Sequence, residues 1–309
     1  MAKVLNDEHL RPQDDILPRT KTQSILSTRA LCPLAIRFNY STRRKVNDII
    51  QNNVTSNLAA GKPAVSFQVR LVESIEIAQI AKSCGYDTLY IDLEHCMHSM
   101  HQTSQICMAA LAVGITPFVR VPSYAPEYVS RVLDGGAMGI IAPHVSNRNE
   151  AERVVAAAKF PPLGDRSVSI GLPQLKFQNY PLAEARRELN AKTTVVTMLE
   201  GPDAVDNAEE IAAVEGVDIL FIGTNDLCAQ LGIDGQFDHP KVKEIYAHVT
   251  AVARKHGKHV GVGGLSGHPE LLTQFVKMGA LYISAGSDLQ YMVSGATART
   301  KLLRSALNV

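Results

Sequence analysis

From residue 64 onward, two hydrophobic patterns alternate along the sequence. Short, continuous apolar runs are followed by segments in which apolar residues recur every three or four positions. Continuous runs are typical of parallel strands that are buried on both faces, and the longer period is typical of helices with one buried face. We expect eight strands, at residues 64–69, 87–93, 115–120, 138–143, 193–199, 218–223, 258–263 and 280–285.

The segments between the strands carry helix start and stop signals. Residues 242–253 follow Pro240 and precede Gly257, as expected of a helix with proline in its first turn and glycine beyond its last. Eight strand–helix units in succession predict an α/β fold, a (β/α)8 TIM barrel. The alternative is a doubly wound open sheet, which would more naturally show Gly-x-Gly-x-x-Gly after the first strand, and none follows Val69.

Residues 1–45 fall outside this scheme and form an expected N-terminal extension ahead of a barrel domain at residues 46–309. The extension mixes acidic and basic residues, contains prolines and shows no sustained period, which predicts a flexible or loosely draped segment. Its arginines would suit a mitochondrial presequence, but acidic residues such as Asp14 and Asp15 argue against one.

The composition excludes several classes of function. The chain has 309 residues, 46% of them hydrophobic, and a formal net charge of +1, so its electrostatics favour neither nucleic acid nor an anionic membrane surface. No apolar stretch approaches the roughly 20 residues that a membrane-spanning helix needs. The five cysteines are scattered and odd in number, which is typical of a reducing compartment, and we expect a cytoplasmic protein.

A long connection, residues 160–180, follows the helix after the fourth strand. It contains the run Pro161-Pro162-Leu163-Gly164-Asp165-Arg166-Ser167. Long loops in compact barrels are usually functional, so we expect an active-site cover, with a simple spacer as the alternative.

Polar residues collect at the carboxyl ends of the expected strands, where barrel enzymes place their reacting groups. The strands end, in chain order from the second to the sixth, in Asp92-Leu93-Glu94-His95, Arg120, Pro143-His144, Glu200 and Gly223-Thr224-Asn225-Asp226. Several loops at the opposite ends contain mainly small turn residues, such as Gly135-Gly136. This asymmetry predicts an active site at the carboxyl ends of the strands.

Glu200 and Asp226 follow successive strands, so both carboxylates are expected to face one cleft. Carboxylate oxygens suit Mg²⁺ or Mn²⁺, with water and substrate in the remaining positions. The alternative for Asp226 is structural, because it could cap the helical segment at residues 227–231. The backbone N–H groups of Thr224, Asn225 and Asp226 are candidates to hold a substrate carboxylate at the start of that segment.

Arg120 and His95 are candidate catalytic side chains at the same end. A buried arginine is costly unless it meets an anion, so Arg120 predicts either an anionic substrate or a structural salt bridge to Glu94 or Glu200. His95 is the natural acid or base, because imidazole titrates near neutrality.

Two other chemistries are disfavoured. The spacing His95-x-x-His98-x-x-His101 lacks the His-Glu-x-x-His form of a zinc site, so zinc is not expected. No lysine stands at the carboxyl end of an expected strand, which argues against Schiff-base chemistry.

Six motifs also resemble those of a known family. They are Ile91-Asp92-Leu93-Glu94-His95, Val119-Arg120-Val121-Pro122, Leu133-Asp134-Gly135-Gly136-Ala137, Phe160-Pro161-Pro162-Leu163-Gly164-Asp165-Arg166, Met198-Leu199-Glu200 and Phe221-Ile222-Gly223-Thr224-Asn225-Asp226-Leu227. In this order they resemble the metal-dependent (class II) pyruvate aldolases of the hydroxyheptanedioate/2-keto-3-deoxyglucarate aldolase family. The extension and the Pro-Pro-Leu-Gly-Asp-Arg-Ser loop resemble most closely its macrophomate synthase branch, which acts on oxaloacetate and a 2-pyrone.

The resemblance implies a role for each matched residue. Glu200 and Asp226 would bind a divalent metal, Mg²⁺ or Mn²⁺, that chelates the keto oxygen and carboxylate of pyruvate or oxaloacetate. Arg120 would stabilise the enolate oxygen. His95, supported by Asp92, would move protons through water.

The resemblance also implies an assembly. The family forms hexamers from pairs of barrels that exchange their last helix, so residues 288–308 are expected to pack on a partner subunit. Asp134 of a neighbouring subunit would then support His95. The expected substrate-binding residues are Gly223, Thr224, Asn225 and Arg166.

Three positions depart from the family pattern. Leu93 stands where many bacterial members have glycine, Thr224-Asn225 where Pro-Ala is common, and Ser167 where glycine is common. All three changes lie near the expected substrate, so they leave the metal chemistry intact and the identity of the substrate open.

The sequence therefore predicts a divalent-metal-dependent carbon–carbon lyase that forms a pyruvate enolate. The enolate would come from oxaloacetate by decarboxylation or from a 4-hydroxy-2-oxo acid by retro-aldol cleavage, and it could be added to an aldehyde or a pyrone-like electrophile. One alternative is a plain 2-keto-3-deoxy-acid or hydroxyheptanedioate aldolase. The alternative from another class is a non-catalytic barrel subunit.

Overall fold

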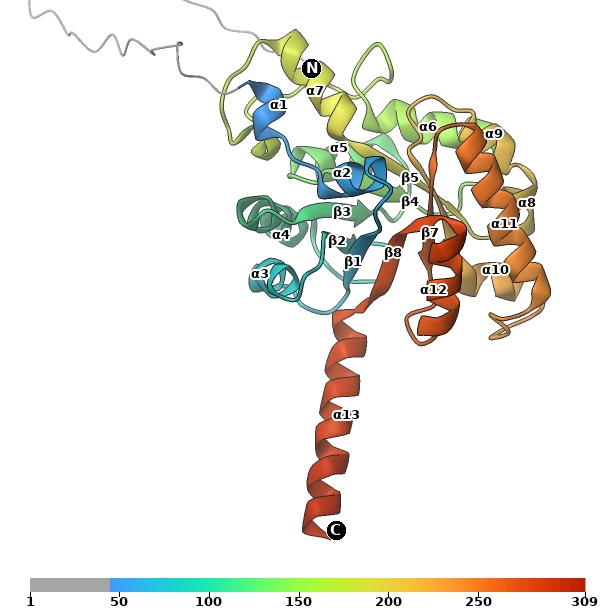
Figure 1. Cartoon of the computed structure of the whole chain (residues 1–309). Helices are drawn as coiled ribbons and strands as arrows, with labels where there is room; N and C mark the ends of the chain where they lie inside the picture. Colours follow the sequence, from blue (N-terminus) through green and yellow to red (C-terminus); the bar gives the residue numbers. More distant parts are fainter. Residues whose placement is uncertain (1–44, 309) are drawn as a thin grey trace, which may run out of the picture. The chain divides into compact units, whose positions relative to one another are not determined.

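The computed structural model describes residues 45–308, and eight parallel strands in this part of the chain form one closed barrel in the order β1 to β8 (Figure 1). The strands are β1 (Ala64–Val69), β2 (Thr88–Asp92), β3 (Thr116–Arg120), β4 (Gly139–Ala142), β5 (Thr194–Leu199), β6 (Ile219–Gly223), β7 (His259–Gly263) and β8 (Ala280–Ser287). The (β/α)8 prediction is confirmed. The open-sheet alternative is wrong, because β8 pairs with β1 and closes the sheet.

Helices alternate with the strands. They are α1 (Val46–Ile49), α2 (Asn53–Ala59), α3 (Glu76–Ser83), α4 (Met100–Val113), α5 (Pro126–Asp134), α6 (Arg148–Ala158), α7 (Leu182–Lys192), α8 (Pro202–Asp206), α9 (Ala208–Ala212), α10 (Thr224–Gln230), α11 (Pro240–Lys255), α12 (Pro269–Met278) and α13 (Asp288–Leu307). The bounds of α4 follow from its end residues. Ser99 and Gln102 form a capping box at its start, and Gly114 ends it in the left-handed region with φ of 74°.

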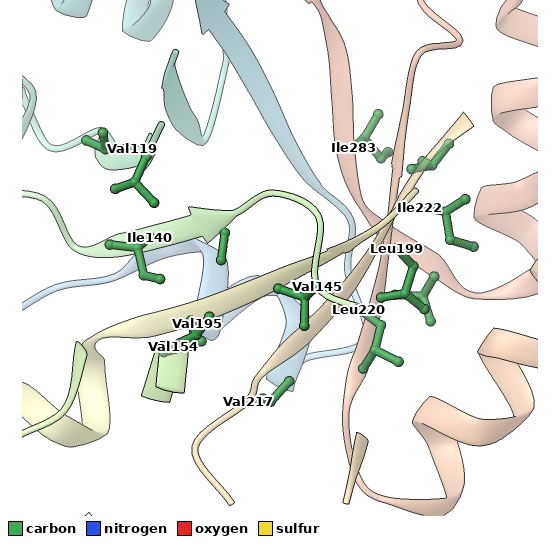
Figure 2. Packing of buried hydrophobic residues seen from close by; sticks show 14 of the residues in the cluster. Val119, Ile140, Val145, Val154, Val195, Leu199, Val217, Leu220, Ile222 and Ile283 are labelled. Carbon is green, nitrogen blue, oxygen red and sulfur yellow. The ribbon is translucent and has the colours of Figure 1, made fainter. Parts of the chain in front are cut away.

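A layer of buried aliphatic side chains joins the strands to the helices around them. Figure 2 shows part of this layer, in which Val119, Ile140, Val195, Leu220 and Ile222 come from four neighbouring strands. Successive side chains of a strand point to opposite faces, so these residues use one face of each strand and leave the other face for the barrel interior.

Large side chains fill that interior. Tyr90, Phe221 and Tyr282 are 2% exposed or less. Phe221 fits because its neighbours on β7 are glycines, since a Cβ on Gly261 or Gly263 would lie only 2.4 or 2.5 Å from its ring. The barrel is therefore a packed core, and a site can form only at one of its ends.

The amino-terminal end of the barrel is closed by the segment that precedes β1 and by the long connection before α7. Val46, Ile50 and Val54 belong to the same buried cluster as the interior residues, and so do Leu172 and Leu175 of the connection.

The expected active-site cover, residues 160–180, is therefore at the wrong end of its own barrel. A connection that leads from a helix into the next strand lies at the amino ends of the strands, away from the reacting groups. Gln174 fixes it there, because its amide donates to the carbonyl oxygens of Leu133 and Ala137 at 2.6 and 2.9 Å. This prediction from loop length is corrected, because it took no account of which end the loop joins.

The carboxyl ends of the strands bring predicted site residues onto one inner face. Asp92 lies two residues beyond the inward-facing Tyr90, and Arg120 lies two residues beyond Phe118. The parallel register of β2 and β3 places Asp92 directly beside Arg120. The site is thus assembled by strand alternation and register.

The last helix, α13, projects from the end of β8 as a single helix (Figure 1). Of its 20 residues only Asp288 is buried. Met292, Val293, Leu302, Leu303 and Leu307 are between 51% and 69% exposed. Exposed apolar side chains on one extended element are typical of a surface that packs against another molecule.

The expected N-terminal extension lies outside the described residues, apart from residue 45. Among the helices that are described, none is both long and apolar enough to cross a membrane. Cys84, Cys96, Cys107 and Cys228 carry free thiols, and Cys32 lies outside the described residues.

Candidate active site

A pocket of about 310 Å³ opens at the carboxyl ends of the strands. Tyr90, Met198 and Phe221 from the barrel interior form part of its lining. The other lining residues are polar or glycine: Gln68, Arg70, His95, Arg120, Gly223, Thr224, Asn225, Asp226, Gly263, Gly264, Ser266, Ser284, Gly286, Ser287 and Gln290. Six of the ten residues predicted for the site therefore line one pocket.

Arg120 is the centre of a buried charge network beside this pocket. Its Nε and Nη2 donate to the two oxygens of Asp92 at 3.0 and 2.6 Å, and its Nη1 lies 2.8 Å from Glu94 Oε2. Its guanidinium also lies over the ring of Tyr90, 5.5 Å from the centroid. The structural salt bridge that the sequence left open is thus formed with Glu94 and with Asp92, while Arg120 still faces the pocket.

Opposite charges set the protonation states of this pair. Burial would raise the pKa of Asp92, but hydrogen bonds and charge from Arg120 lower it overall. Burial would lower the pKa of Arg120, but Tyr90 and then Asp92 raise it overall. Asp92 is therefore an anion and Arg120 a cation at neutral pH.

Glu200 is 3% exposed and is held by His144. The backbone N–H of His144 donates to Glu200 Oε2 at 2.8 Å, and its ring Nδ1 lies 3.0 Å from the same oxygen. The ring Nε2 lies 3.0 Å from Glu94 Oε1, so one imidazole connects the two glutamates. His144 has φ of 53°, an uncommon conformation for a non-glycine residue that often marks functional sites.

Burial and neighbouring carboxylates both disfavour the charged form of Glu200. Burial raises the pKa of Glu200, and the nearby carboxylates of Asp226 and Glu94 raise it further, while His144 opposes them. Asp226 itself is exposed, and its side chain makes no hydrogen bond or ion pair with the rest of the described chain.

Gly223 brings the two acidic residues close together. A Cβ at this position would lie 2.7 Å from Glu200 Cγ and 3.0 Å from Glu200 Oε1. The missing side chain therefore lets the Glu200 carboxylate lie against the strand end that leads into Asp226. The alternative role for Asp226, a helix cap, is wrong, because α10 begins at Thr224 and its N-cap is Gly223.

Thr224 and Asn225 differ in what they can offer a substrate. The Thr224 hydroxyl is fully buried, donates to the Gly263 carbonyl at 2.6 Å and lies 2.8 Å from the Tyr246 hydroxyl, so it fixes the strand end. Asn225 is exposed to the pocket, and Gly264 gives it room, since a Cβ there would lie 3.0 Å from its amide nitrogen.

His95 stands at the pocket mouth with its side chain 55% exposed. Asp92 supports it through the backbone, because Asp92 Oδ1 accepts hydrogen bonds from the N–H groups of Glu94 and His95 at 3.1 and 3.2 Å. His98 instead lies 3.1 Å from the Val72 carbonyl oxygen. Within residues 45–308, no three His, Cys, Asp or Glu side chains form a group that could hold a metal ion.

Two predicted residues lie elsewhere in the chain. Asp134 ends α5, at the amino ends of the strands, and pairs there with Arg166 at 2.6 Å. The Arg166 side chain is 1% exposed and lies 4.5 Å from the centroid of the Phe160 ring. Arg166 therefore makes no contact with the pocket of its own chain. The predicted role of Asp134 in a neighbouring subunit stays a prediction.

Comparison with known proteins shows the family of this chain. The family model for HpcH/HpaI aldolase/citrate lyase matches residues 71–295. The chain belongs to this family. A 4-hydroxy-4-methyl-2-oxoglutarate aldolase of Hapsidospora irregularis is 38% identical over 252 residues, which cover 80% of this chain and 93% of that protein. A 5-keto-4-deoxy-D-glucarate aldolase of Citrobacter koseri is 33% identical over 243 residues, which cover 79% of this chain and 93% of that protein.

Solved structures of other proteins share the same fold. The HpcH/HpaI aldolase from Desulfitobacterium hafniense matches with a TM-score of 0.77 at 29% identity, covering 82% of this chain and 97% of that one. Macrophomate synthase matches with a TM-score of 0.67 at 21% identity, covering 85% and 91%. At that identity the likeness to macrophomate synthase concerns the fold alone.

Aldolases of the HpcH/HpaI family are generally divalent-metal dependent, and the residues of this pocket fit such an ion. Glu200 and Asp226 supply oxygen donors at the ends of neighbouring strands, and Gly223 leaves the space that a side chain would fill. Mg²⁺ is usually held by one or two carboxylates and keeps its other positions for water and substrate. These two carboxylates would therefore leave coordination positions of the ion free for water and substrate.

Sequence reasoning assigned no catalytic or binding role to three residues that shape this site, His144, Glu94 and Arg70. Each of them follows an expected strand at its carboxyl end, which is the signal that could have found them. Their contacts depend on the backbone turn at residue 144 and on side-chain pairing between strands, which no local pattern encodes.

Proposed function

We propose that this protein is a divalent-metal-dependent lyase that forms a pyruvate enolate from a 4-hydroxy-2-oxo acid or from oxaloacetate. The observation that carries the proposal is a pair of carboxylates in a member of an aldolase family. Asp226 lines the same pocket as Arg120, and Glu200 lies buried behind the pocket-lining Gly223. A pair of acids and a fixed cation at one pocket suit a reaction that develops negative charge on an oxygen.

Glu200 and Asp226 would hold the metal. Bound there, Mg²⁺ or Mn²⁺ would act as a Lewis acid toward the keto oxygen of the substrate. His144 keeps the Glu200 carboxylate oriented through its backbone N–H and its ring. The fit of two carboxylates at neighbouring strand ends supports this assignment.

Arg120 would stabilise the negative charge that appears on the enolate oxygen. It remains a cation because Asp92 and Glu94 hold it on two sides. These partners also fix its orientation, so little reorganisation is needed as the charge forms. Decarboxylation of oxaloacetate needs only such stabilisation of the enolate.

Retro-aldol cleavage also needs a base. In a 4-hydroxy-2-oxo acid, the C4 hydroxyl loses its proton, the bond between C3 and C4 breaks, and C3 of the resulting pyruvate enolate is then protonated. His95 lines the pocket at its solvent-exposed mouth, where an imidazole can accept the proton through water.

The relatives favour a dicarboxylic substrate. The named substrates of the two aldolases, an oxoglutarate and a glucarate derivative, each carry two carboxylates. We therefore favour 4-hydroxy-4-methyl-2-oxoglutarate or a close analogue over a pyrone-like electrophile, and cleavage would yield two pyruvates. Product analysis with oxaloacetate, alone and with added aldehydes or a 2-pyrone, separates these possibilities.

The exposed apolar side chains of α13 support assembly into a homo-oligomer. In such an assembly α13 would cover its apolar side chains on a partner subunit, as in the helix exchange implied by the family resemblance. Asp134, which is fixed by Arg166 and 39% exposed at its side chain, would be available to a neighbouring subunit.

The test is release of pyruvate, followed with lactate dehydrogenase and NADH, from 4-hydroxy-4-methyl-2-oxoglutarate and from oxaloacetate. Reactions with Mg²⁺, with Mn²⁺ and with chelator are compared, and a no-enzyme blank removes the background from free metal. We expect metal-stimulated release that is lost in Glu200→Gln.

The matched control is Glu209→Gln, because Glu209 is a more exposed glutamate that pairs with Lys255 and His256 away from the pocket. Release that survives chelation and the Glu200→Gln change would overturn the metal assignment. If there were also no cleavage and no thermal stabilisation by Mn²⁺, the non-catalytic barrel would be favoured.

A further inference from the structure

Arg70 enters the pocket from the side opposite Glu200. It follows β1 directly and lines the pocket. In a closed barrel of eight strands, β1 lies across the axis from β5, which leads into Glu200. A substrate bound by its keto-acid end near Glu200 and Asp226 would therefore extend its other end toward Arg70.

A buried carboxylate holds the backbone at Arg70. Asp288 is 4% exposed and accepts hydrogen bonds from the N–H groups of Arg70, Leu71 and Val72 at distances of 2.8–3.1 Å. Hydrogen bonds to a charged acceptor are strong, so the loop after β1 is well fixed. The backbone that carries the arginine side chain is thus held rigidly, as a preorganised binding site requires.

Within residues 45–308, no carboxylate lies within hydrogen-bond distance of the Arg70 guanidinium. Its closest carboxylate oxygen is Asp92 Oδ2, 3.6 Å from Nε, which is beyond hydrogen-bond distance. Asp92 is already satisfied by Arg120, by Gln68 at 3.2 Å and by two backbone N–H groups. Arg70 Nε is buried and has no hydrogen-bond partner within the described residues.

Cys96 is a further polar neighbour of Arg70, but a weak hydrogen-bond acceptor. Its thiol interacts with the guanidinium. The Arg70 side chain is 36% exposed, so part of it remains open to the pocket. A fixed arginine with free donors in a pocket is suited to bind a planar carboxylate through two hydrogen bonds.

We infer that Arg70 is a specificity residue that binds the distal carboxylate of the substrate, the one farthest from the keto group. The inference rests on the proposed function and names the residue that would recognise the second carboxylate of the dicarboxylic 2-oxo acids favoured there. Arg120 would remain with the enolate oxygen, while Arg70 would select substrates by their far end. Loss of Arg70 should then affect diacids and leave monoacids unchanged.

A matched pair of ligands that cannot undergo retro-aldol cleavage tests this directly. 2-Oxoglutarate and 2-oxopentanoate have the same number of carbons and differ by a carboxylate in place of a methyl group. Calorimetric titration in the presence of Mn²⁺ should show that the wild-type protein binds 2-oxoglutarate about 10- to 100-fold more tightly. In Arg70→Ala this preference should disappear, while the affinity for 2-oxopentanoate stays within about twofold.

Two variants keep the result interpretable. Arg70→Lys should retain part of the preference, because it keeps the charge but loses the planar, two-pronged geometry. Arg148→Ala removes an exposed arginine that pairs with Glu152 on α6, and it should bind both ligands as the wild type does. Equal weakening of both ligands in Arg70→Ala, or an unchanged preference, would overturn the inference.

Cleavage gives a second readout that separates this inference from the proposed function. 4-Hydroxy-2-oxoglutarate and 4-hydroxy-2-oxopentanoate differ in the same way at the far end. Arg70→Ala should raise KM for the diacid and change neither KM nor kcat for the monoacid. If the wild type released no pyruvate from either of these acids or from oxaloacetate, the proposed function would fail, whereas equal effects of Arg70→Ala on the diacid and the monoacid would overturn only the role of Arg70.

Discussion

Replacement of Gly223 by alanine tests whether the position of Glu200 controls activity. The added Cβ would lie 2.7 Å from Glu200 Cγ and 3.3 Å from Glu200 Cδ. Carbon atoms in contact normally lie about 3.5 Å or more apart, so the glutamate must shift by about 0.8 Å. Gly223 has φ of −82°, so alanine adds no backbone strain, and the effect comes from this contact alone.

The size of the expected effect follows from the surroundings of Glu200. The side chain is 3% exposed and cannot swing into solvent without breaking its contacts with His144. A misplacement of about 1 Å in a catalytic site can lower the rate about 100-fold. Overpacking at such a position costs about 1–3 kcal/mol of unfolding free energy, so the protein should remain folded.

The assay combines kcat/KM for pyruvate release, Mn²⁺ affinity by calorimetry and thermal unfolding. Gly223→Ala should lose about 100-fold in kcat/KM and bind Mn²⁺ more weakly, with a melting temperature lower by only a few degrees. The matched control is Gly267→Ala, where a Cβ would meet no atom within 4 Å. If Gly223→Ala behaved like this control in both activity and metal affinity, the reasoning would be refuted.

Three further predictions concern the charge network and the last helix. Asp92→Asn should lower the unfolding free energy by about 3–5 kcal/mol, because it leaves the buried Arg120 short of a partner. Because folding lowers the pKa of Asp92, its ionised carboxylate stabilises the wild type fully above the ordinary pKa of 3.8, and this stabilisation is lost as the pH falls through the folded pKa. The difference in unfolding free energy between the wild type and Asp92→Asn should therefore shrink below about pH 4. If urea titrations gave the same difference in unfolding free energy between the wild type and Asp92→Asn above and below pH 4, this prediction would be contradicted. His144→Asn, which tolerates the left-handed backbone, should lower kcat/KM about tenfold or more by releasing Glu200, and wild-type rates would argue against that role. Leu303→Glu in α13 should reduce the molar mass measured by light scattering, and an unchanged mass would exclude this helix from the interface.

The fold was predictable because its signals are local. Each strand is a continuous apolar run, and each expected strand agrees with the observed one to within two residues. What local patterns could not supply was the end of the barrel to which a segment belongs. Residues 160–180 have the length of an active-site loop, but their position between a helix and a strand places them at the closed end.

The sequence predicted which residues form the site better than it predicted how they contact one another. Strand alternation and register bring Asp92 and Arg120 together, and both follow from the sequence pattern. The role of His144 depends on its left-handed backbone conformation, which cannot be predicted from the residue types around it. The free donors of Arg70 become visible only when the partners of Asp92 are known, which is a property of the folded chain.

The most direct test of the account is the anomalous scattering of crystals grown with Mn²⁺ and pyruvate. We predict one strong peak at bonding distance from carboxylate oxygens of both Glu200 and Asp226, with the keto acid bound to it. A peak at another place, or none beside these two side chains, would contradict the assignment of the metal to this pocket.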